Sequence, residues 1–272
     1  MRIVEDLGAS HAWRLHRAEL PDGRHAFVKT GGSGRLFASE AAGLRWLGEA
    51  GAVAVPEVID VSDGRLVLSW VETTRPTPEA AERFGRELAR LHGAGAAGFG
   101  APWPGFIAEL PMDNTPVDDT PTADWPSFYA CRRVLPFVRR ARDGGWLSAR
   151  DAALLDGICS RLADVSGPDE PPSRIHGDLW SGNVLWAAGG AVLVDPAAHG
   201  GHRETDLAML ALFGAPHLDR ILAAYEEESP PAAGWRERVP LHQLHPLLVH
   251  VCLYGRAYRD GLMAAVERVQ AI

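Results

Sequence analysis

The sequence predicts an α+β protein with two lobes: a small N-terminal lobe with a mixed β-sheet and a larger, mostly helical C-terminal lobe. Short strand-like runs and one helical pattern occupy residues 1–72, whereas helical periodicity dominates residues 73–272. The chain has 272 residues, of which 46% are hydrophobic, so it is long enough to bury a core in each lobe. We expect the hinge between the lobes near residue 72.

Four strands and one helix are expected in the N-terminal lobe. The turn sequences Pro21-Asp22-Gly23 and Ser62-Asp63-Gly64 each separate two strand-like runs, and each ends in a glycine that accepts a positive φ. Between these hairpins, apolar residues recur at helical spacing from Phe37 to Leu47. The expected strands cover 13–20, 24–29, 56–61 and 65–71.

Helices separated by proline- and glycine-rich connections are expected in the C-terminal lobe. They cover 78–92, 125–141, 148–164, 204–213, 217–228 and 240–258. The stretch 93–122 is rich in proline and is predicted to be a long loop. Loops of this length are usually functional or disordered.

Composition excludes several classes of function. A formal net charge of −8 and a pI near 5.8 argue against general nucleic-acid binding, which needs a basic surface to replace phosphate counterions. The chain shows neither a leader sequence nor an apolar run of membrane-spanning length, so we expect a cytoplasmic protein without a membrane partner. The three cysteines lack CxxC spacing, which indicates reduced thiols.

Lys29 is the one lysine among 27 basic residues, and it ends the apolar run Ala26-Phe27-Val28. Everywhere else the chain meets its need for positive charge with arginine. A lysine is a compact charge on a flexible stem and can reach between phosphate oxygens, whereas arginine is a wider planar fork. We therefore interpret Lys29 as a phosphate-binding residue, with a retained surface lysine as the alternative.

The segment from Ile175 to Leu185, followed by Val192-Leu193-Val194-Asp195, has the spacing of a kinase catalytic loop. In that arrangement an aspartate accepts the proton of the attacking hydroxyl, an asparagine five residues later binds Mg²⁺, and an aspartate after the next strand binds the metal with the nucleotide phosphates. Asp178, Asn183 and Asp195 supply these groups, and oxygen ligands suit Mg²⁺ because it is a hard cation.

Each of these residues also has a structural interpretation. Asp178 and Asn183 favour turns and could form a capped one. Glu40, expected on the helix after Lys29 and suited to orient it, could instead be a solvated helix residue. We expect Asp206 to brace the catalytic loop or to cap a helix. Three histidines on an apolar helix are expected in the core or an interface, with no metal assigned to them: His242, His245 and His250.

Taken together, His176-Gly177-Asp178-Leu179-Trp180-Ser181-Gly182-Asn183, Asp195-Pro196-Ala197-Ala198 and Gly201 to Met209 resemble the fructosamine (ketosamine) kinase family. The resemblance extends over almost the whole chain. It implies the protein-kinase-like two-lobe fold, with residues 1–72 as the nucleotide-binding lobe and hinge and 73–272 as the catalytic and substrate lobe. The same fold includes the aminoglycoside and choline phosphotransferases.

The resemblance also implies roles for individual residues. ATP would contact Lys29, paired with Glu40, and the hinge would bind adenine through its backbone around Ser69, Trp70 and Val71. Asp178 would be the catalytic base, and Asn183 and Asp195 would bind Mg²⁺. The segment that covers the phosphates would include Ser10 and His11. The sugar would lie near Asp178 among substrate-binding residues, for which the candidates are Trp180, Asn114, His199 and His202. Trp180 could equally be a packed aromatic.

Two departures from the family's pattern limit what can be carried over. His11 stands where many members have a redox-active cysteine, so no thiol switch is implied. Asp206 follows Asp195 by only eleven residues, too few for the phosphorylated activation segment of a protein kinase, so a small-molecule substrate is expected.

The expected activity is ATP-dependent phosphorylation of a ketoamine sugar, such as a fructosamine or ribulosamine, at O-3, as in protein deglycation. An aminoglycoside or other amino-alcohol phosphotransferase is an alternative, since an acidic protein suits cationic substrates. A catalytically silent nucleotide-binding module is the non-enzymatic alternative. The sequence does not determine which ketoamine is preferred, or whether it is free or protein-bound. It also leaves open whether ATP or GTP is used and what the oligomeric state is.

Overall fold

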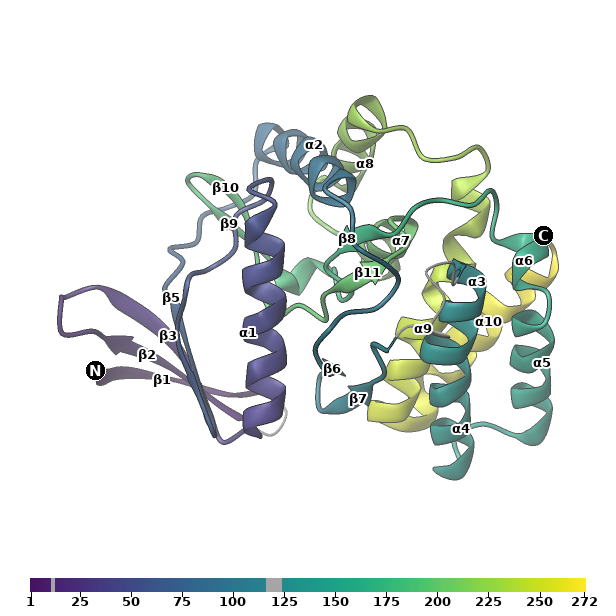
Figure 1. The fold of residues 1–272 in the computed structure, drawn as a ribbon, viewed down its shortest axis with the longest axis horizontal. Coiled ribbons are helices and arrows are strands. Elements are labelled where there is room, and N and C mark those ends of the chain that lie inside the picture. The colour runs from purple at the N-terminus through teal and green to yellow at the C-terminus, as the bar shows by residue number, and fades with distance from the viewer. Residues whose placement is uncertain (11–12, 116–123) are drawn as a thin grey trace.

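The computed structural model describes residues 1–10, 13–115 and 124–272, arranged as two lobes (Figure 1). His11, expected at the phosphates, lies outside the described residues. The sheet of the N-terminal lobe lies on one side, and the helices of the C-terminal lobe lie on the other (Figure 1). Helix α1 (Gly34–Glu49) stands between them and contacts both β4 and the β6–β7 hairpin.

A five-stranded sheet forms the N-terminal lobe, in the order β1-β2-β3-β5-β4. All of its pairings are antiparallel, so the expectation of a mixed sheet is corrected. The strands are β1 (Arg2–Ser10), β2 (Trp13–Glu19), β3 (His25–Thr30), β4 (Val58–Ser62) and β5 (Arg65–Ser69). Strand β1 was not anticipated, because it is an edge strand whose side chains are almost all exposed and show no apolar alternation.

Helix α1 forms where the apolar spacing predicted it. The Ser33 hydroxyl accepts a hydrogen bond from the backbone N–H of Leu36 and caps the first turn. Phe37 and Leu44 are completely buried against the sheet, in a cluster that also contains Trp13 and Leu66. This packing fixes the helix face that carries Glu40, which points toward β3.

The C-terminal lobe is helical, as expected, but three of the expected helices are interrupted: 125–141, 148–164 and 240–258. Its helices are α2 (Pro78–Gly93), α3 (Trp125–Phe128), η1 (Tyr129–Val134), α4 (Leu135–Asp143), α5 (Ala149–Cys159), α6 (Leu162–Val165), α7 (Glu204–Phe213), α8 (Leu218–Glu228), α9 (Trp235–Tyr254), η3 (Gly255–Tyr258) and α10 (Arg259–Gln270). The expected helix over 125–141 contains a π-helical segment, η1, just before Pro136. Proline lacks the N–H that an α-helical bond there would need, which favours this local widening.

The expected loop over 93–122 is partly structured in its described part, 93–115, and the remainder lies outside the described residues. The described part contains a short hairpin, β6 (Gly105–Ile107) and β7 (Leu110–Met112), and Gly100 exchanges two backbone hydrogen bonds with Gly200. The loop therefore packs onto the centre of the C-terminal lobe. Ile107 and Ala108, at the tip of the hairpin, reach the catalytic loop.

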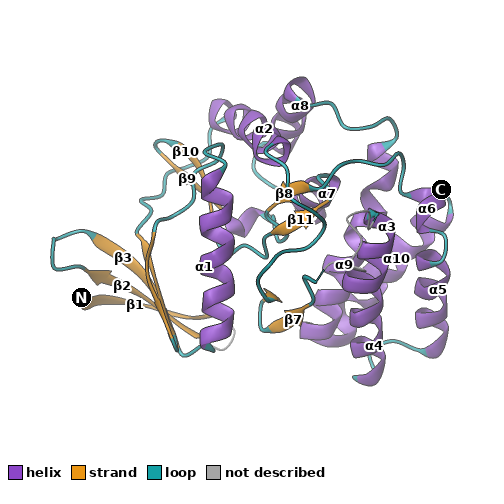
Figure 2. Cartoon of the chain, in the orientation of Figure 1, coloured by secondary structure: helices purple, strands orange, loops and turns teal. Residues whose placement is uncertain are grey.

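Four short strands between the lobes hold the two segments that carry the kinase motif (Figure 2). They form the pairs β8 (Ser173–Ile175) with β11 (His199–Gly201), and β9 (Val184–Ala187) with β10 (Gly190–Leu193). Residues 176–183 connect β8 to β9, and residues 194–198 connect β10 to β11. The boundary predicted at residue 72 lies between β5 and α2, where Thr74 N–H donates to the Trp186 carbonyl at 2.6 Å. In the described part of the chain, no helix combines the length and apolar character needed to cross a membrane.

Candidate active site

Asp178, Asn183 and Asp195 meet at the base of the space between the lobes. The Asn183 side-chain N–H₂ donates to the Asp178 backbone carbonyl at 2.9 Å and to its carboxylate at 3.2 Å. It also reaches the Asp195 carbonyl at 3.4 Å. Asn183 thus ties the two carboxylate-bearing segments together. This network goes beyond a capped turn, because it joins residues from two separate strand connections.

Lys29 approaches the same point from β3. Its Nζ donates to both carboxylate oxygens of Glu40, at 2.8 and 2.9 Å, and to Asp195 Oδ1 at 2.6 Å. Lys29 and Glu40 are 4% and 5% exposed, which excludes both the surface-lysine and the solvated-helix interpretations. Burial by itself would lower the pKa of Lys29, but the carboxylates of Glu40 and Asp195 outweigh it and raise that pKa to about 12. Lys29 therefore stays charged.

The backbone holds Asp195 in an unusual conformation. Its φ is +57°, a left-handed value that non-glycine residues seldom adopt, and its side chain is 47% exposed. Strain of this kind persists only where surrounding structure maintains it, and it gathers at functional sites. The exposed carboxylate is turned toward the cleft, between Lys29 and Asn183.

Asp206 braces the catalytic loop, as expected. It is fully buried, accepts backbone hydrogen bonds from His176 at 2.7 Å and Gly177 at 3.0 Å, and accepts a third from His92 Nε2 at 3.2 Å. His176 continues the bracing through Nε2, which contacts the Val194 carbonyl at 2.9 Å. Burial lowers the pKa of His176, which keeps the ring neutral.

Gly177 is required by the same loop. Its φ is +80°, and a Cβ there would lie 2.3 Å from the Ala197 carbonyl oxygen. Only glycine fits this close approach of the two catalytic segments.

The pKa of Asp178 is raised above the ordinary value for an aspartate. Burial, helped by the charges of Asp195 and Asp206, raises its pKa to about 7, although the hydrogen bond from Asn183 acts in the opposite direction. A base works best when its pKa lies near the operating pH. A displaced pKa in a cleft is also a general indicator of a functional site.

A cavity of about 330 Å³ lies between the lobes, and most of the residues predicted to bind the nucleotide line it. Lys29, Glu40, Asn183 and Asp195 line its inner end. Its wall also includes Ser10 and the predicted hinge residues Ser69, Trp70 and Val71. The rest of its lining is largely apolar, which suits the flat adenine ring of a nucleotide.

Two further cavities open on Asp178 and Trp180. One, of about 130 Å³, lies between Asp178 and Asp195 and is bordered by Ser10 and Glu40. The other, of about 410 Å³, extends from Asp178 over α7 and α9. Trp180 is 40% exposed and lines both cavities, and its role as a substrate residue stays a prediction.

The structure does not bring the other three predicted substrate residues to these cavity walls. Asn114 is buried and accepts from Arg133 Nη2 at 2.7 Å. His199 is buried behind the loop, where its Nδ1 contacts the Ala197 carbonyl at 2.8 Å. His202 lines a separate cavity beside Trp125. All three are held by contacts within the C-terminal lobe, so the family resemblance that suggested them did not imply that they line the cavities at Asp178.

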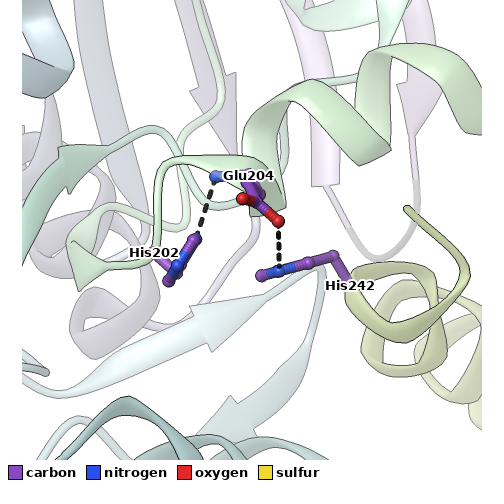
Figure 3. Close-up of side chains that lie close together, drawn as sticks. All are labelled: His202, Glu204 and His242. Carbon is purple, nitrogen blue, oxygen red and sulfur yellow. Dashed lines mark hydrogen bonds and ion pairs between the residues drawn. The ribbon is translucent and has the colours of Figure 1, made fainter. Parts of the chain in front are cut away.

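His202, Glu204 and His242 form a buried group whose side chains could in principle hold a metal ion (Figure 3). The two oxygens of Glu204 accept from Arg238 at 2.6 and 3.0 Å, and His242 Nε2 lies 3.3 Å from one of them. His202 Nδ1 accepts the Glu204 backbone N–H at 3.2 Å. The carboxylate is thus neutralised by an arginine, and we interpret the group as a structural link between α7 and α9.

Sequence reasoning missed several aromatic residues at the cavities. Trp13 lines both the interlobe cavity and the smaller one, with Lys29 Nζ 5.7 Å from its ring centroid. Phe213, Tyr254 and Tyr258 line the cavity of about 410 Å³. The spacing of His250, Tyr254 and Tyr258, four residues apart, was the available signal, since it places aromatic rings on one helix face.

An antiparallel N-terminal lobe that presents Lys29, opposite a loop that presents Asp178, Asn183 and Asp195, defines a phosphotransferase of the protein-kinase-like class. Comparisons with known proteins give the family. A family model described as fructosamine kinase matches residues 8–271. The chain therefore belongs to the fructosamine kinase family, which makes it a small-molecule kinase that uses a nucleotide.

Individual relatives agree with this assignment. The chain is 34% identical to the probable ketoamine kinase TTHA1179 of Thermus thermophilus over 85% of its length and 82% of that protein's. It is 32% identical to the probable ketoamine kinase YniA of Escherichia coli, over 96% and 89% of the two chains. A crystal structure assigned as a fructosamine-3-kinase from Thermobifida fusca superposes with a TM-score of 0.94 at 52% identity, covering 100% of this chain and 94% of that one.

An aminoglycoside phosphotransferase in a ternary complex with AMP-PNP and hygromycin B superposes with a TM-score of 0.67 at 16% identity. The match covers 98% of this chain and 91% of that one. At such low identity the likeness shows a common fold and no more.

Proposed function

We propose that the protein is a cytoplasmic kinase that transfers the γ-phosphoryl group of ATP to O-3 of a ketoamine sugar, in a protein deglycation role. The observation that carries the proposal is the placement of Asp178, with its raised pKa, at the junction of the nucleotide cavity and the cavities around Trp180. The membership in the fructosamine kinase family supports the substrate class.

Asp178 would accept the proton of the attacking hydroxyl. General base catalysis of this kind increases the reaction rate by a factor of about 10² to 10⁴. Lys29, oriented by Glu40, would contact the nucleotide phosphates. Placement of the reactants and neutralisation of charge account for most of the catalysis in phosphoryl transfer.

The donor set fits Mg²⁺. Asn183 and Asp195 offer an amide and an exposed carboxylate near Asp178, and Mg²⁺ binds such oxygen ligands together with phosphate and water. These two residues would hold the ion, which neutralises phosphate charge when bound. The nearby Lys29 already contacts Asp195, so the site presents charges of both signs to a nucleotide.

The structure gives less support to an aminoglycoside acceptor. Those substrates carry several positive charges and need several carboxylates to bind them. Among the described residues that line the cavity of about 410 Å³, Asp178 is the only acidic one. The sugar of a ketoamine is attached to one amine and carries no charge of its own, so it suits this wall better.

The test is phosphorylation of ribulosyl-lysine, fructosyl-lysine and kanamycin by the purified protein with Mg·ATP, followed by mass spectrometry. We expect a gain of one phosphoryl group on a ketoamine, lost in Asp178→Asn and retained in Asp143→Asn, a matched change at an exposed site on α4. Modification of kanamycin alone would support the antibiotic-kinase alternative. Nucleotide binding without any transfer would support a silent binding module.

A second variant tests the interpretation of Lys29. Lys29→Arg keeps the charge but cannot place three N–H donors on Glu40 and Asp195 from one atom. We expect turnover to fall by at least tenfold, and near-wild-type turnover would contradict the role given to the compact ammonium.

A further inference from the structure

We propose that the cavity of about 410 Å³ over α7 and α9 binds the substituent carried by the ketoamine nitrogen, and that it selects uncharged aromatic or aliphatic substituents over those that carry a carboxylate. The inference rests on the proposed function, because it assumes that the sugar hydroxyl lies at Asp178. It adds the chemical class of the amine portion, which the catalytic residues alone leave undefined.

The arrangement of the cavities assigns the two ends of the acceptor. The smaller cavity runs from Asp178 toward Asp195 and Glu40, the side on which Lys29 contacts both carboxylates. At about 130 Å³ it has room for the reacting groups. The larger cavity, of about 410 Å³, leaves Asp178 in the other direction, over α7 and α9. An acceptor with its hydroxyl at Asp178 must extend into this second space.

The wall of the larger cavity is a chain of aromatic rings that begins beside the catalytic base. Trp180 meets Phe213 edge to face, with ring centroids 6.5 Å apart. Phe213 then contacts His250 at 5.0 Å, and His250 contacts Tyr258 at 4.7 Å and Tyr254 at 5.6 Å. The rings come from the catalytic loop, the end of α7, α9 and η3, so the wall is assembled by the fold.

Three of these rings are available to a ligand. Trp180, Phe213 and Tyr254 are 40%, 43% and 52% exposed, although large aromatic side chains are usually well buried. Clustered aromatic exposure in a concave site is typical of a binding wall, because each ring offers a large contact area with few rotatable bonds. A flat or extended apolar substituent would bury these surfaces.

The charges of the cavity give it selectivity. Asp178 is the only charged side chain among the described residues that line it, and none of them is lysine or arginine. His250 is neutral, because burial lowers its pKa, and its Nδ1 is engaged with the Pro246 carbonyl at 2.7 Å. A carboxylate placed here would lose water without gaining a cationic partner, which is unfavourable.

The ammonium of the ketoamine is accommodated by the same wall. Only C-1 and C-2 separate the nitrogen from C-3, so a hydroxyl at Asp178 brings the nitrogen close to this carboxylate and to the Trp180 ring. A cation over an indole face is attracted by the ring's negative face. The wall thus accepts the positive nitrogen at its inner end and an uncharged substituent beyond it.

The experiment compares ketoamines that share one sugar, fructose, and differ only in the amine: methylamine, benzylamine and glycine. For the wild-type protein we expect kcat/KM to be about tenfold higher for the benzylamine adduct than for the methylamine adduct, because the phenyl ring is buried on the aromatic wall. The glycine adduct, with a carboxylate next to the nitrogen, should be at least tenfold poorer than the methylamine adduct.

Variants of the wall test its role through the ratio of the benzylamine to the methylamine value. Phe213→Ala and Tyr254→Ala should reduce this ratio from about ten to near one, mainly through KM, whereas Phe213→Tyr should preserve it. Ile3→Ala removes an exposed apolar side chain from β1, remote from the cavities, and is the matched control. Because the readout is a ratio within one variant, partial loss of folded protein does not affect it.

The outcomes separate the inference from the proposed function. Wild-type protein that phosphorylates none of the three adducts refutes both. Phosphorylation of all three at equal efficiency, or a ratio that survives both alanine substitutions, refutes the inference and leaves the ketoamine kinase activity established. A glycine adduct preferred over the methylamine adduct would also overturn it, since it would require a cationic partner at the wall.

Discussion

The Lys29→Met substitution would remove the ammonium that neutralises Glu40 while keeping a side chain of similar length at a buried position. Glu40 is 5% exposed and accepts two hydrogen bonds from Lys29 Nζ, at 2.8 and 2.9 Å. Breaking a buried ion pair by removing one partner costs about 3–5 kcal/mol, because the remaining charge stays buried. Asp195, the other partner of Lys29, is half-exposed and would stay hydrated.

Protonation of Glu40 sets an upper bound on the destabilisation. Burial raises its pKa above the ordinary value of 4.5 even with Lys29 present, and loss of Lys29 would raise it further. At about 1.36 kcal/mol per pH unit, protonating the carboxylate costs about 5 kcal/mol at pH 8 and about 1 kcal/mol at pH 5.5. An acid whose pKa is higher in the folded state than in the unfolded state makes folding less favourable as the pH rises. The variant should therefore lose most stability at alkaline pH.

The free energy of unfolding can be measured by urea denaturation at pH 5.5 and pH 8. The proteins to compare are wild type, Lys29→Met, Glu40→Gln and the double variant. We expect Lys29→Met to lose about 3 kcal/mol at pH 8 and clearly less at pH 5.5. Adding Glu40→Gln should restore at least about 2 kcal/mol at pH 8 without restoring activity. A double variant as unstable at pH 8 as Lys29→Met would refute the reasoning, because the buried charge of Glu40 would then not be the cause.

Three further predictions follow from the catalytic loop. The kcat/KM of the wild-type protein should rise with pH through about 7 as Asp178 loses its proton, and a flat profile from pH 5.5 to 8.5 would contradict its role as base. Gly177→Ala should destabilise the protein by about 2 kcal/mol or more and abolish activity, because its Cβ would meet the Ala197 carbonyl; Gly189→Ala, which meets nothing within 4 Å, should retain activity, and equal effects would disprove the argument. Asp206→Asn should cost about 2–3 kcal/mol in urea denaturation, since one acceptor is replaced by a donor facing backbone N–H groups, and an unchanged midpoint would rule out the bracing role.

The fold could be predicted largely from local sequence patterns. Apolar periodicity located α1 because Phe37 and Leu44 face a single sheet and are both completely buried. It failed for β1, whose exposed residues have no apolar face to repeat. It also failed for the end of the chain, where α10 (Arg259–Gln270) follows the 3₁₀ turn η3. That turn interrupts the helical pattern without a proline to mark it.

The proximity of the three candidate catalytic residues was predictable for a different reason. Asp178, Asn183 and Asp195 lie close together in the chain, on two strand connections, so their spacing constrains their geometry directly. Asn114 and His202 were inferred only by resemblance, and their places depend on tertiary packing: one binds Arg133 and the other faces Trp125. The aromatic wall was missed as a whole because no local pattern connects Trp180 and Phe213 to the evenly spaced rings of His250, Tyr254 and Tyr258.

The position of Lys29 explains why the chain keeps one lysine there. An ammonium has three N–H donors, and in this structure all three directions are accounted for by Glu40 Oε1, Glu40 Oε2 and Asp195 Oδ1. A nucleotide phosphate can therefore accept a hydrogen bond from Lys29 only if the ammonium gives up one of these three hydrogen bonds. The contact to Asp195 is the one to a half-exposed carboxylate, whereas the contacts to Glu40 are buried. If a phosphate oxygen replaces Asp195 as a partner of Lys29, one movement frees both Asp195, the proposed metal ligand, and Lys29, the proposed phosphate-binding residue. A guanidinium fixed by two parallel hydrogen bonds would not allow this exchange.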